Sequence, residues 1–310
     1  VHRRWDRPVG HTGNGILIDG REVPLTGHAS PAESVWSGDD IDIVLECSGR
    51  FKTGAALQPY YDHGIAKVIV SAPVKEAGAL NIVMGVNEHL YDPAQHHLLT
   101  AASCTTNCLA PVAKVLDDTF GFSTFRPLQR EIITGLLAGE NSFVLMPTGG
   151  GKSLCYQLPA LLLDGLTIVV SPLIALMKDQ VDSLVESGVE ATFINSSLES
   201  DEIDRRRRGV IDGTTKLLYV APERLLTPSF LSLLDSVELS LLAIDEAHCI
   251  SEWGHDFRSE YRRLATIRER YPDVPVVAMT ATANERVSSD ILAQLQLGDE
   301  ARIYIAGFDR

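Results

Sequence analysis

The sequence lacks long hydrophobic runs, and its few cysteines are scattered. No apolar stretch approaches the ~18 residues that a membrane-spanning helix requires, and residues 1–5 are not followed by the apolar core of a signal peptide. The five cysteines form no Cys-x-x-Cys pair, which argues against a disulfide framework and against a zinc site. We therefore expect a cytoplasmic protein with reduced thiols and no membrane partner.

Positive charge is also scarce. The formal net charge is −14, and acidic residues outnumber basic ones in residues 1–117 and in residues 118–310 alike. Such a surface repels a nucleic-acid backbone, so any contact with one must be local. The run Arg205–Arg208 follows several acidic residues, and we expect a solvated, salt-bridged helix face there instead of a DNA-binding patch.

A glycine-rich loop is present in the segment Leu-Met-Pro-Thr-Gly-Gly-Gly-Lys-Ser that ends at Ser153. It follows a short apolar segment, expected to be a strand (141–146), and precedes an apolar stretch of helical length (152–162). Backbone N–H groups of such a loop bind phosphate oxygens, Lys152 adds a positive charge beside the β/γ-phosphates, and Ser153 binds Mg²⁺. Met146 stands where the generic pattern has its first glycine, so the interpretation depends on this strand–loop–helix context.

Two adjacent acids follow in the sequence Asp245-Glu-Ala-His. They end an apolar run (241–244) that we expect to be a strand, and open α/β sheets bind ligands at the carboxyl ends of strands. Asp245 is predicted to bind Mg²⁺ and Glu246 to orient and activate the attacking water. With Lys152 as the third catalytic residue, the two motifs predict ATP hydrolysis; a glycine turn and a solvated acidic loop are the alternative.

Residues 1 to about 117 alternate expected strands with helices and loops. The expected strands are 41–46, 66–71 and 81–84, and the pattern predicts a parallel α/β arrangement. Cys104 lies just before an apolar helical stretch, where the helix dipole favours the thiolate and makes it a candidate nucleophile. A small buried core thiol is the alternative.

These segments resemble glyceraldehyde-3-phosphate dehydrogenase over residues 1 to about 118. The resemblance implies that Cys104 attacks an aldehyde and that Ser48-Gly49 and Ser71 border an NAD pocket. The family's first βαβ unit and catalytic histidine are absent, so we expect a vestigial nucleophile, and NAD binding only in a complete fragment. The motifs that carry the resemblance are Ser103-Cys-Thr-Thr-Asn-Cys108, Glu46-Cys-Ser-Gly-Arg-Phe51, Ser71-Ala-Pro73 and Val83-Met-Gly-Val-Asn87.

From residue 119 the chain resembles the first motor domain of RecQ-type DNA helicases. The segment Phe125-Arg-Pro-Leu-Gln-Arg-Glu-Ile-Ile133 resembles the family's adenine-reading motif, which implies that Gln129 hydrogen-bonds the adenine edge. An amide offers the donor and the acceptor that adenine requires, although an ordinary exposed helical glutamine is the alternative. Phe122 and Arg126 would stack or pack on the ring. The implied ATP-binding residues are Phe122, Arg126, Gln129, Thr148, Gly149, Gly150, Gly151, Lys152 and Ser153.

The most specific part of this resemblance is Ala247-His-Cys-Ile-Ser-Glu-Trp-Gly-His-Asp-Phe-Arg258, of which we call residues 251–258 the aromatic loop. Aromatic and cationic side chains directly after the catalytic acids can stack bases and contact phosphate. Segments 169–180 and 219–225 resemble further single-strand contacts, and Met279-Thr-Ala-Thr282, after an expected strand (274–278), resembles the coupling motif. The implied DNA-binding or coupling residues are His248, Trp253, His255, Phe257, Arg258, Thr280 and Thr282, with core packing as the alternative for Trp253 and Phe257.

The expected fold is α/β in both parts, a RecA-like P-loop parallel sheet over 119–310 preceded by an incomplete Rossmann-type fragment over 1–118. No glycine-, serine- or proline-rich linker separates them, which suggests a fusion. We expect the fragment's strands to present an unpaired, aggregation-prone edge. Residues 308–310 resemble the start of a second motor domain, expected beyond Arg310, that carries an arginine finger.

Three functions remain open. The first is an ATP-dependent 3′–5′ DNA helicase motor domain that binds Mg-ATP and single-stranded or partly unwound DNA. The second is an NAD-dependent dehydrogenase fragment, and the third is a chimera that binds ATP without productive unwinding. We expect the first as the encoded function and weak or absent activity in this chain.

Overall fold

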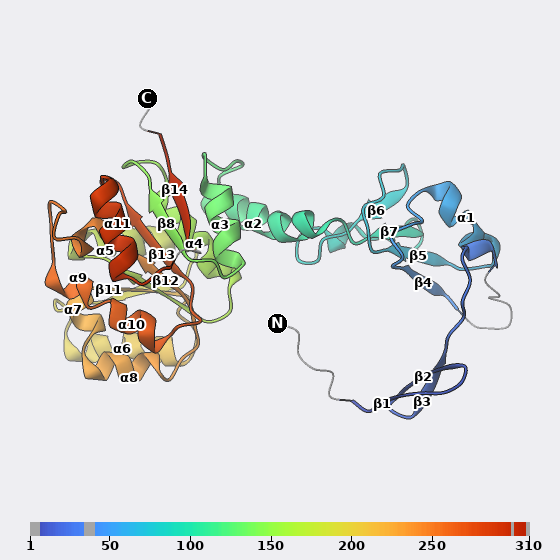
Figure 1. Ribbon diagram of the computed structural model, residues 1–310, viewed down its shortest axis with the longest axis horizontal. Helices are drawn as coiled ribbons and strands as arrows, with labels where there is room; N and C mark the ends of the chain where they lie inside the picture. Colours follow the sequence, from blue (N-terminus) through green and yellow to red (C-terminus); the bar gives the residue numbers. More distant parts are fainter. Residues whose placement is uncertain (1–6, 34–40, 299–300, 308–310) are drawn as a thin grey trace. The chain divides into compact units, whose positions relative to one another are not determined.

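The computed structural model describes residues 7–33, 41–298 and 301–307. Two units make up the chain, Val1–Asn107 and Cys108–Arg310, and each has its own hydrophobic core (Figure 1). The division falls within a helix, α2 (Cys104–Phe120). The boundary at residues 118–119 stays a prediction.

A parallel sheet is the centre of the C-terminal unit. The described residues form seven strands in the spatial order β10 (Ala191–Ile194), β11 (Leu217–Val220), β9 (Leu166–Val170), β12 (Leu239–Ile244), β13 (Val276–Thr280), β8 (Ser142–Leu145) and β14 (Arg302–Ile305). Every neighbouring pair is parallel, as the sequence predicts for this part. The expected strand at 141–146 is β8, and the one at 241–244 is the end of β12.

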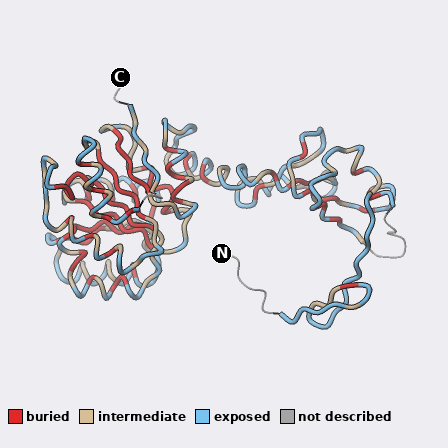
Figure 2. The backbone as a smooth tube through the Cα atoms, in the orientation of Figure 1, coloured by how far each residue is buried: buried red, intermediate tan, exposed pale blue. Residues whose placement is uncertain are grey.

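Helices cover both faces of this sheet. Alternation along β8 sends Phe143 and Leu145 into one core cluster and Val144 with Met146 into the other, so the strands are buried on both sides (Figure 2). Helices α3, α4 and α5 pack on the Val144 side. The helices of this unit are α3 (Gln129–Leu137), α4 (Lys152–Leu162), α5 (Ile174–Glu186), α6 (Ser200–Ile211), α7 (Pro222–Leu225), α8 (Pro228–Leu234), the 3₁₀ helix η3 (Ala247–Ile250), α9 (Ser259–Arg262), α10 (Ala265–Arg270) and α11 (Glu285–Gln294).

Helix α6 carries the arginine run. Arg205 and Arg206 both pair with Glu202, one turn earlier, and the Arg206 guanidinium also lies 4.2 Å from the centre of the Phe193 ring. The expectation of a salt-bridged helix face is confirmed. Among the described helices, none has the length and apolarity that crossing a membrane requires.

The N-terminal unit contains two small sheets. An antiparallel sheet, which the sequence reading did not anticipate, consists of β1 (Val9–His11), β2 (Gly15–Ile18) and β3 (Arg21–Pro24). A parallel sheet has the order β4 (Ile43–Glu46), β5 (Lys67–Val70), β7 (Leu98–Thr100) and β6 (Ala79–Asn81). The helices are η1 (Pro31–Glu33), α1 (Gly54–Asp62) and η2 (Glu88–Leu90). Leu57 of α1 packs with the sheet in a small core.

The third strand expected in this unit is misplaced. Strand β6 ends at Asn81, although the Ile82 N–H still donates to the Thr100 carbonyl at 2.9 Å. The chain then turns, because the Asn87 side chain accepts a hydrogen bond from the Val83 N–H and Gly85 adopts a left-handed conformation (φ +80°). The strand that completes the sheet, β7, was missed because it is only three residues long. Within the described residues β4 pairs on one side only, which leaves the unpaired edge that the sequence predicts. Ile43 and Leu45, which share one face of this strand, are exposed.

Candidate functional site

Three strand ends bring the predicted catalytic residues to one edge of the larger sheet. Strand β13 lies between β8 and β12, and all three are parallel. The glycine-rich loop follows the carboxyl end of β8, and the acid pair Asp245-Glu246 follows that of β12. Thr280 is the last residue of β13. Parallel pairing therefore unites motifs that are far apart in the sequence.

The glycine-rich loop has the conformation that its composition allows. Gly149 and Gly151 are left-handed, with φ of +79° and +86°. A Cβ on Gly150 would lie 2.6 Å from Cγ of Met146, whose side chain is buried. The methionine that replaces the pattern's first glycine is thus a core residue beneath the loop, and it requires glycine at position 150.

Lys152 is the first residue of α4, and its side chain turns back over the loop. The ammonium group donates hydrogen bonds to the carbonyl oxygens of Met146 (3.1 Å) and Pro147 (3.4 Å). A cation beside a glycine-rich loop at a helix N-terminus is suited to phosphate oxygens, which are stronger acceptors than these carbonyls.

The two acids differ in environment. Asp245 is 6% exposed, and burial, followed by the charge of Glu246, raises its pKa to about 6. Glu246 has a left-handed backbone (φ 49°), and its carboxylate lies 3.3 Å from Nδ1 of His248. That hydrogen bond lowers the pKa of Glu246 although the side chain is partly buried. Glu246 is therefore ionised and oriented, whereas Asp245 is a buried carboxylate that a cation would stabilise.

His248 connects the acids to the predicted coupling motif. Its Nδ1 lies 2.9 Å from the hydroxyl of Thr280, which also contacts the backbone of Thr282 at 3.1 and 3.2 Å. The ring of His255 stacks on His248 with centres 4.3 Å apart. A continuous contact path thus runs from Glu246 to strand β13 and to the aromatic loop.

Gln129 lies beside the glycine-rich loop in this structure. It is 2% exposed, its amide N–H₂ donates to the Gly151 carbonyl at 3.0 Å, and its oxygen accepts from the Arg126 N–H at 2.8 Å. The Arg126 guanidinium donates to the Gly149 carbonyl. A cavity of about 250 Å³ opens here, lined by Phe122, Thr124, Arg126, Gln129, Gly151 and Leu154. Its apolar and amide lining has the character that a purine ring needs.

The aromatic loop exposes its rings. Trp253 is 57% and Phe257 40% exposed, so neither is a core anchor. The Arg286 guanidinium of α11 lies 3.4 Å from the centre of the Trp253 ring, a contact that no sequence motif indicated. Arg258 donates to the Pro172 carbonyl at 3.1 Å, which ties the loop to the predicted single-strand segment after β9.

Cys104 is the first residue of α2 and is exposed. In the described parts of the chain its thiol takes part in no hydrogen bond with another side chain. Its role as a vestigial nucleophile stays a prediction.

Comparison with known proteins gives the family. A family model described as DEAD/DEAH box helicase matches residues 126–291, which is more than half of the chain and contains both catalytic motifs. The chain belongs to the DEAD/DEAH box helicase family. A second model, of the NAD-binding domain of glyceraldehyde 3-phosphate dehydrogenase, matches residues 1–54.

Within the helicase family, the chain is similar to proteins named as DNA helicases of the RecQ type and to a related helicase. It is 50% identical over 196 residues to "ATP-dependent DNA helicase RecQ" of Pasteurella multocida, covering 63% of this chain and 31% of that protein. Identity is 49% over 193 residues to the protein of the same name in Bacillus subtilis (62% and 32%), and 45% over 202 residues to "ATP-dependent helicase wrn-1" of Caenorhabditis elegans (63% and 19%). The chain spans about a third or less of the length of these relatives.

Proposed function

We propose that residues 119–310 are the ATP-binding motor domain of a RecQ-like, 3′–5′ DNA helicase. One observation carries the proposal: Lys152, the Asp245-Glu246 pair and Thr280 meet at one sheet edge, and His248 links the acids to the threonine. The names of the relatives support DNA as the substrate. We also propose a cytoplasmic location, in keeping with five free cysteines.

The residues fit a magnesium nucleotide. Asp245 and Ser153 offer the oxygen ligands that Mg²⁺ prefers, and the raised pKa of Asp245 marks a carboxylate short of positive charge. Bound Mg²⁺ would neutralise charge on the phosphates. Lys152 and the loop N–H groups hold the phosphates, and Glu246, held by His248, orients the water for attack on the γ-phosphorus. The cavity beside Gln129 receives the adenine.

Single-stranded or partly unwound DNA would lie on the aromatic loop. Trp253 and Phe257 offer stacking surfaces, and Arg258 and His255 offer groups for phosphate. Because His255 stacks on His248, and His248 contacts Glu246, strand binding can change the position of the hydrolytic acid. This gives DNA-dependent ATP turnover a structural route.

A second motor domain beyond Arg310 is part of the proposal. The family resemblance assigns to it the arginine finger, which is worth about 10³ to 10⁵ in rate in nucleotide hydrolases. Residues 308–310, which resemble its start, lie outside the described residues. We further propose that residues 1–118 are a dehydrogenase fragment with Cys104 as a vestigial nucleophile, without NAD turnover. The family match to residues 1–54 supports the dehydrogenase likeness of that part.

Nucleotide binding by Lys152→Ala tests the proposal. Wild-type chain should bind a fluorescent ATP analogue in a Mg²⁺-dependent manner, and Lys152→Ala should bind at least tenfold more weakly because the phosphates lose their nearest cation. Lys114→Ala, which removes an exposed lysine paired with Asp118, is the matched control. Equal binding by wild type and Lys152→Ala would refute the ATP site.

Turnover assays separate the three functions. Slow ATP hydrolysis that single-stranded DNA accelerates supports the helicase motor, whereas binding without turnover supports the unproductive chimera. Reduction of NAD with glyceraldehyde 3-phosphate would support the dehydrogenase. Strand separation by the purified chain would contradict the need for a second motor domain.

A further inference from the structure

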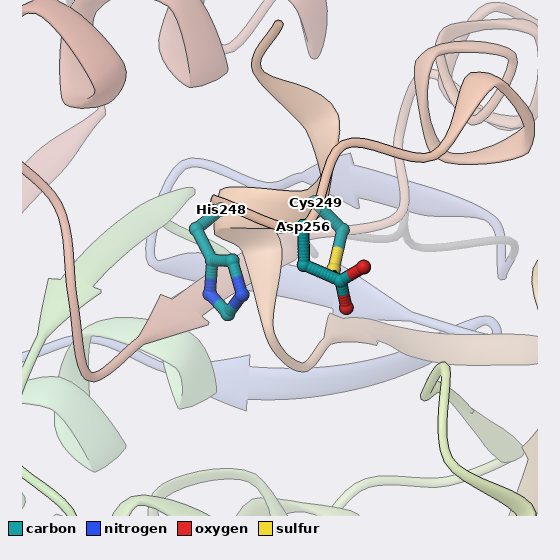
Figure 3. A group of neighbouring side chains, drawn as sticks. All are labelled: His248, Cys249 and Asp256. Carbon is teal, nitrogen blue, oxygen red and sulfur yellow. The ribbon is translucent and has the colours of Figure 1, made fainter. Parts of the chain in front are cut away.

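A group of metal-ligating side chains lies beside the catalytic acids. His248 and Cys249 belong to η3, and Asp256 belongs to the aromatic loop. One ligand atom from each lies within 4.8 Å of the other two, and Figure 3 shows the Cys249 sulfur next to the Asp256 carboxylate with the His248 ring nearby. A nitrogen, a sulfur and an oxygen ligand therefore converge from two segments.

The distances are close to those of a tetrahedral zinc site. Zinc–ligand bonds of about 2.0 to 2.3 Å place neighbouring ligand atoms roughly 3.5 Å apart. The Cys249 sulfur and an Asp256 oxygen are already 3.8 Å apart. The longest of the three separations, at most 4.8 Å, exceeds this value by about 1.3 Å or less. Asp256 is exposed, so its carboxylate is the ligand with most room to adjust.

The fold holds two of the ligands in place. His248 and Cys249 are buried, and the Cys249 carbonyl accepts a 2.9 Å hydrogen bond from the Arg258 N–H. Asp256 is the adjustable ligand, and its carboxylate accepts from the Arg258 guanidinium at 3.1 Å and from the Cys249 thiol at 3.8 Å. A divalent cation bound to Asp256 would take the place of the Arg258 guanidinium, and the Arg258 side chain would lose its ion pair with Asp256.

The ligand types select the metal. Thiolate and imidazole favour Zn²⁺ over the hard cations Mg²⁺ and Ca²⁺. Three protein ligands leave a fourth position for water, unlike the closed four-ligand sites that zinc domains use to fold. The missing Cys-x-x-Cys pairs predict that the chain has no zinc site. The cluster found here needs no such pair, because its ligands are one imidazole, one thiolate and one carboxylate.

We propose that His248, Cys249 and Asp256 bind one zinc-class divalent cation, which joins the catalytic segment to the aromatic loop. The site is distinct from the Mg²⁺ position at Asp245 and Ser153. Its binding is measured without ATP, so it stands or falls separately from the proposed helicase function.

Metal binding must displace the Cys249 proton. Burial, and then the negative charge of Asp256, raise the pKa of this thiol to about 12, with Arg258 opposing and Glu246 adding to the shift. The cation therefore has to supply the energy of deprotonation, and we expect moderate affinity with release of a proton on binding.

Cobalt titration of the whole chain tests the site. The background carries Cys47→Ser, Cys104→Ser and Cys108→Ser, which remove the exposed thiols. Co²⁺ should produce a near-ultraviolet thiolate charge-transfer band that saturates at one ion per chain. Zn²⁺ should displace the Co²⁺, and a large excess of Mg²⁺ should not.

Two variants locate the metal. Cys249→Ser should abolish the band, and Asp256→Asn should weaken Co²⁺ binding by about tenfold or more. Cys155→Ser is the matched control, because Cys155 is the other buried cysteine and its sulfur faces the Gly151 carbonyl at 3.8 Å. If Cys249→Ser fails to fold, Co²⁺ binding by Asp256→Asn, a substitution at an exposed position, still tests the site. No band in the starting background, or a band unchanged in Asp256→Asn, would overturn the proposal.

Discussion

Gly151 shows how one residue joins two motifs. It ends the glycine-rich loop with φ +86°, and its carbonyl accepts a hydrogen bond from the Gln129 amide, so the predicted adenine segment and the glycine-rich loop share a contact. A Cβ at this position would lie 2.4 Å from the Gln129 nitrogen. The glycine is therefore required by backbone conformation and by space together.

We predict that Gly151→Ala weakens ATP binding at least tenfold and lowers stability by about 1 to 3 kcal/mol, from left-handed strain and overlap with Gln129. Gly213→Ala is the control, since Gly213 is also left-handed (φ +70°) but has open space at its Cβ position. Denaturant unfolding and nucleotide titration measure both effects. Equal losses of stability in the two variants would show that the contact with Gln129 contributes nothing.

Met146 illustrates what residue-level reasoning could and could not predict. The strand–loop–helix context predicted the loop between β8 and α4 despite the departure from the generic pattern, and α4 begins and ends at the expected residues 152 and 162. Why a methionine is accepted needed the structure, because burial beneath Gly150 is a tertiary contact.

At the scale of elements, the aromatic loop and α11 form a contact that no linear pattern reveals. Arg286 covers one face of Trp253, and the other aromatic ring, Phe257, remains exposed. A cation over a partly exposed indole contributes about 0.5 to 2 kcal/mol. This favours one orientation of the Trp253 side chain but still allows others. Helix α11 follows Thr282, so this contact adds a link between the coupling motif and the loop.

We predict that Arg286→Ala makes Trp253 more accessible to a neutral quencher, since one ring face loses its cover. With Trp5→Phe and Trp36→Phe in the background, Trp253 is the only fluorescent indole of the chain. Acrylamide quenching should rise modestly in Arg286→Ala, because Trp253 is already 57% exposed, and should not change in the control Arg302→Ala, whose guanidinium pairs with Glu140. Identical quenching in both variants would exclude the contact in solution.

At the scale of the whole molecule, each unit has a separate core. Leu57 is fully buried in the N-terminal core, whereas Lys152 and the acids belong to the C-terminal unit. Units with separate cores can unfold in separate transitions, and ligand binding stabilises only the unit that binds.

We predict that Leu57→Ala destabilises the N-terminal unit by about 2 to 5 kcal/mol, the range for a leucine cavity in a core. Mg-ATP should raise the unfolding temperature of the C-terminal unit only, in the wild type and in the variant alike. Differential scanning calorimetry with and without nucleotide measures both transitions. A single transition that moves with both Leu57→Ala and Mg-ATP would contradict separate unfolding.

Local sequence determined the strands that are long and buried and the helix after the glycine-rich loop, because hydrophobic period and glycine content act over a few neighbours. The catalytic roles of Lys152, Asp245 and Glu246 stay proposals. It failed for the three-residue strand β7, where the signal is too short. Only the tertiary structure decided that His248 contacts Glu246 and Thr280, that Arg286 covers Trp253, and that Asp256 approaches Cys249. These residues come into contact because of the order of the strands and the path of the loops. Residue spacing within a single segment encodes neither the strand order nor the loop path.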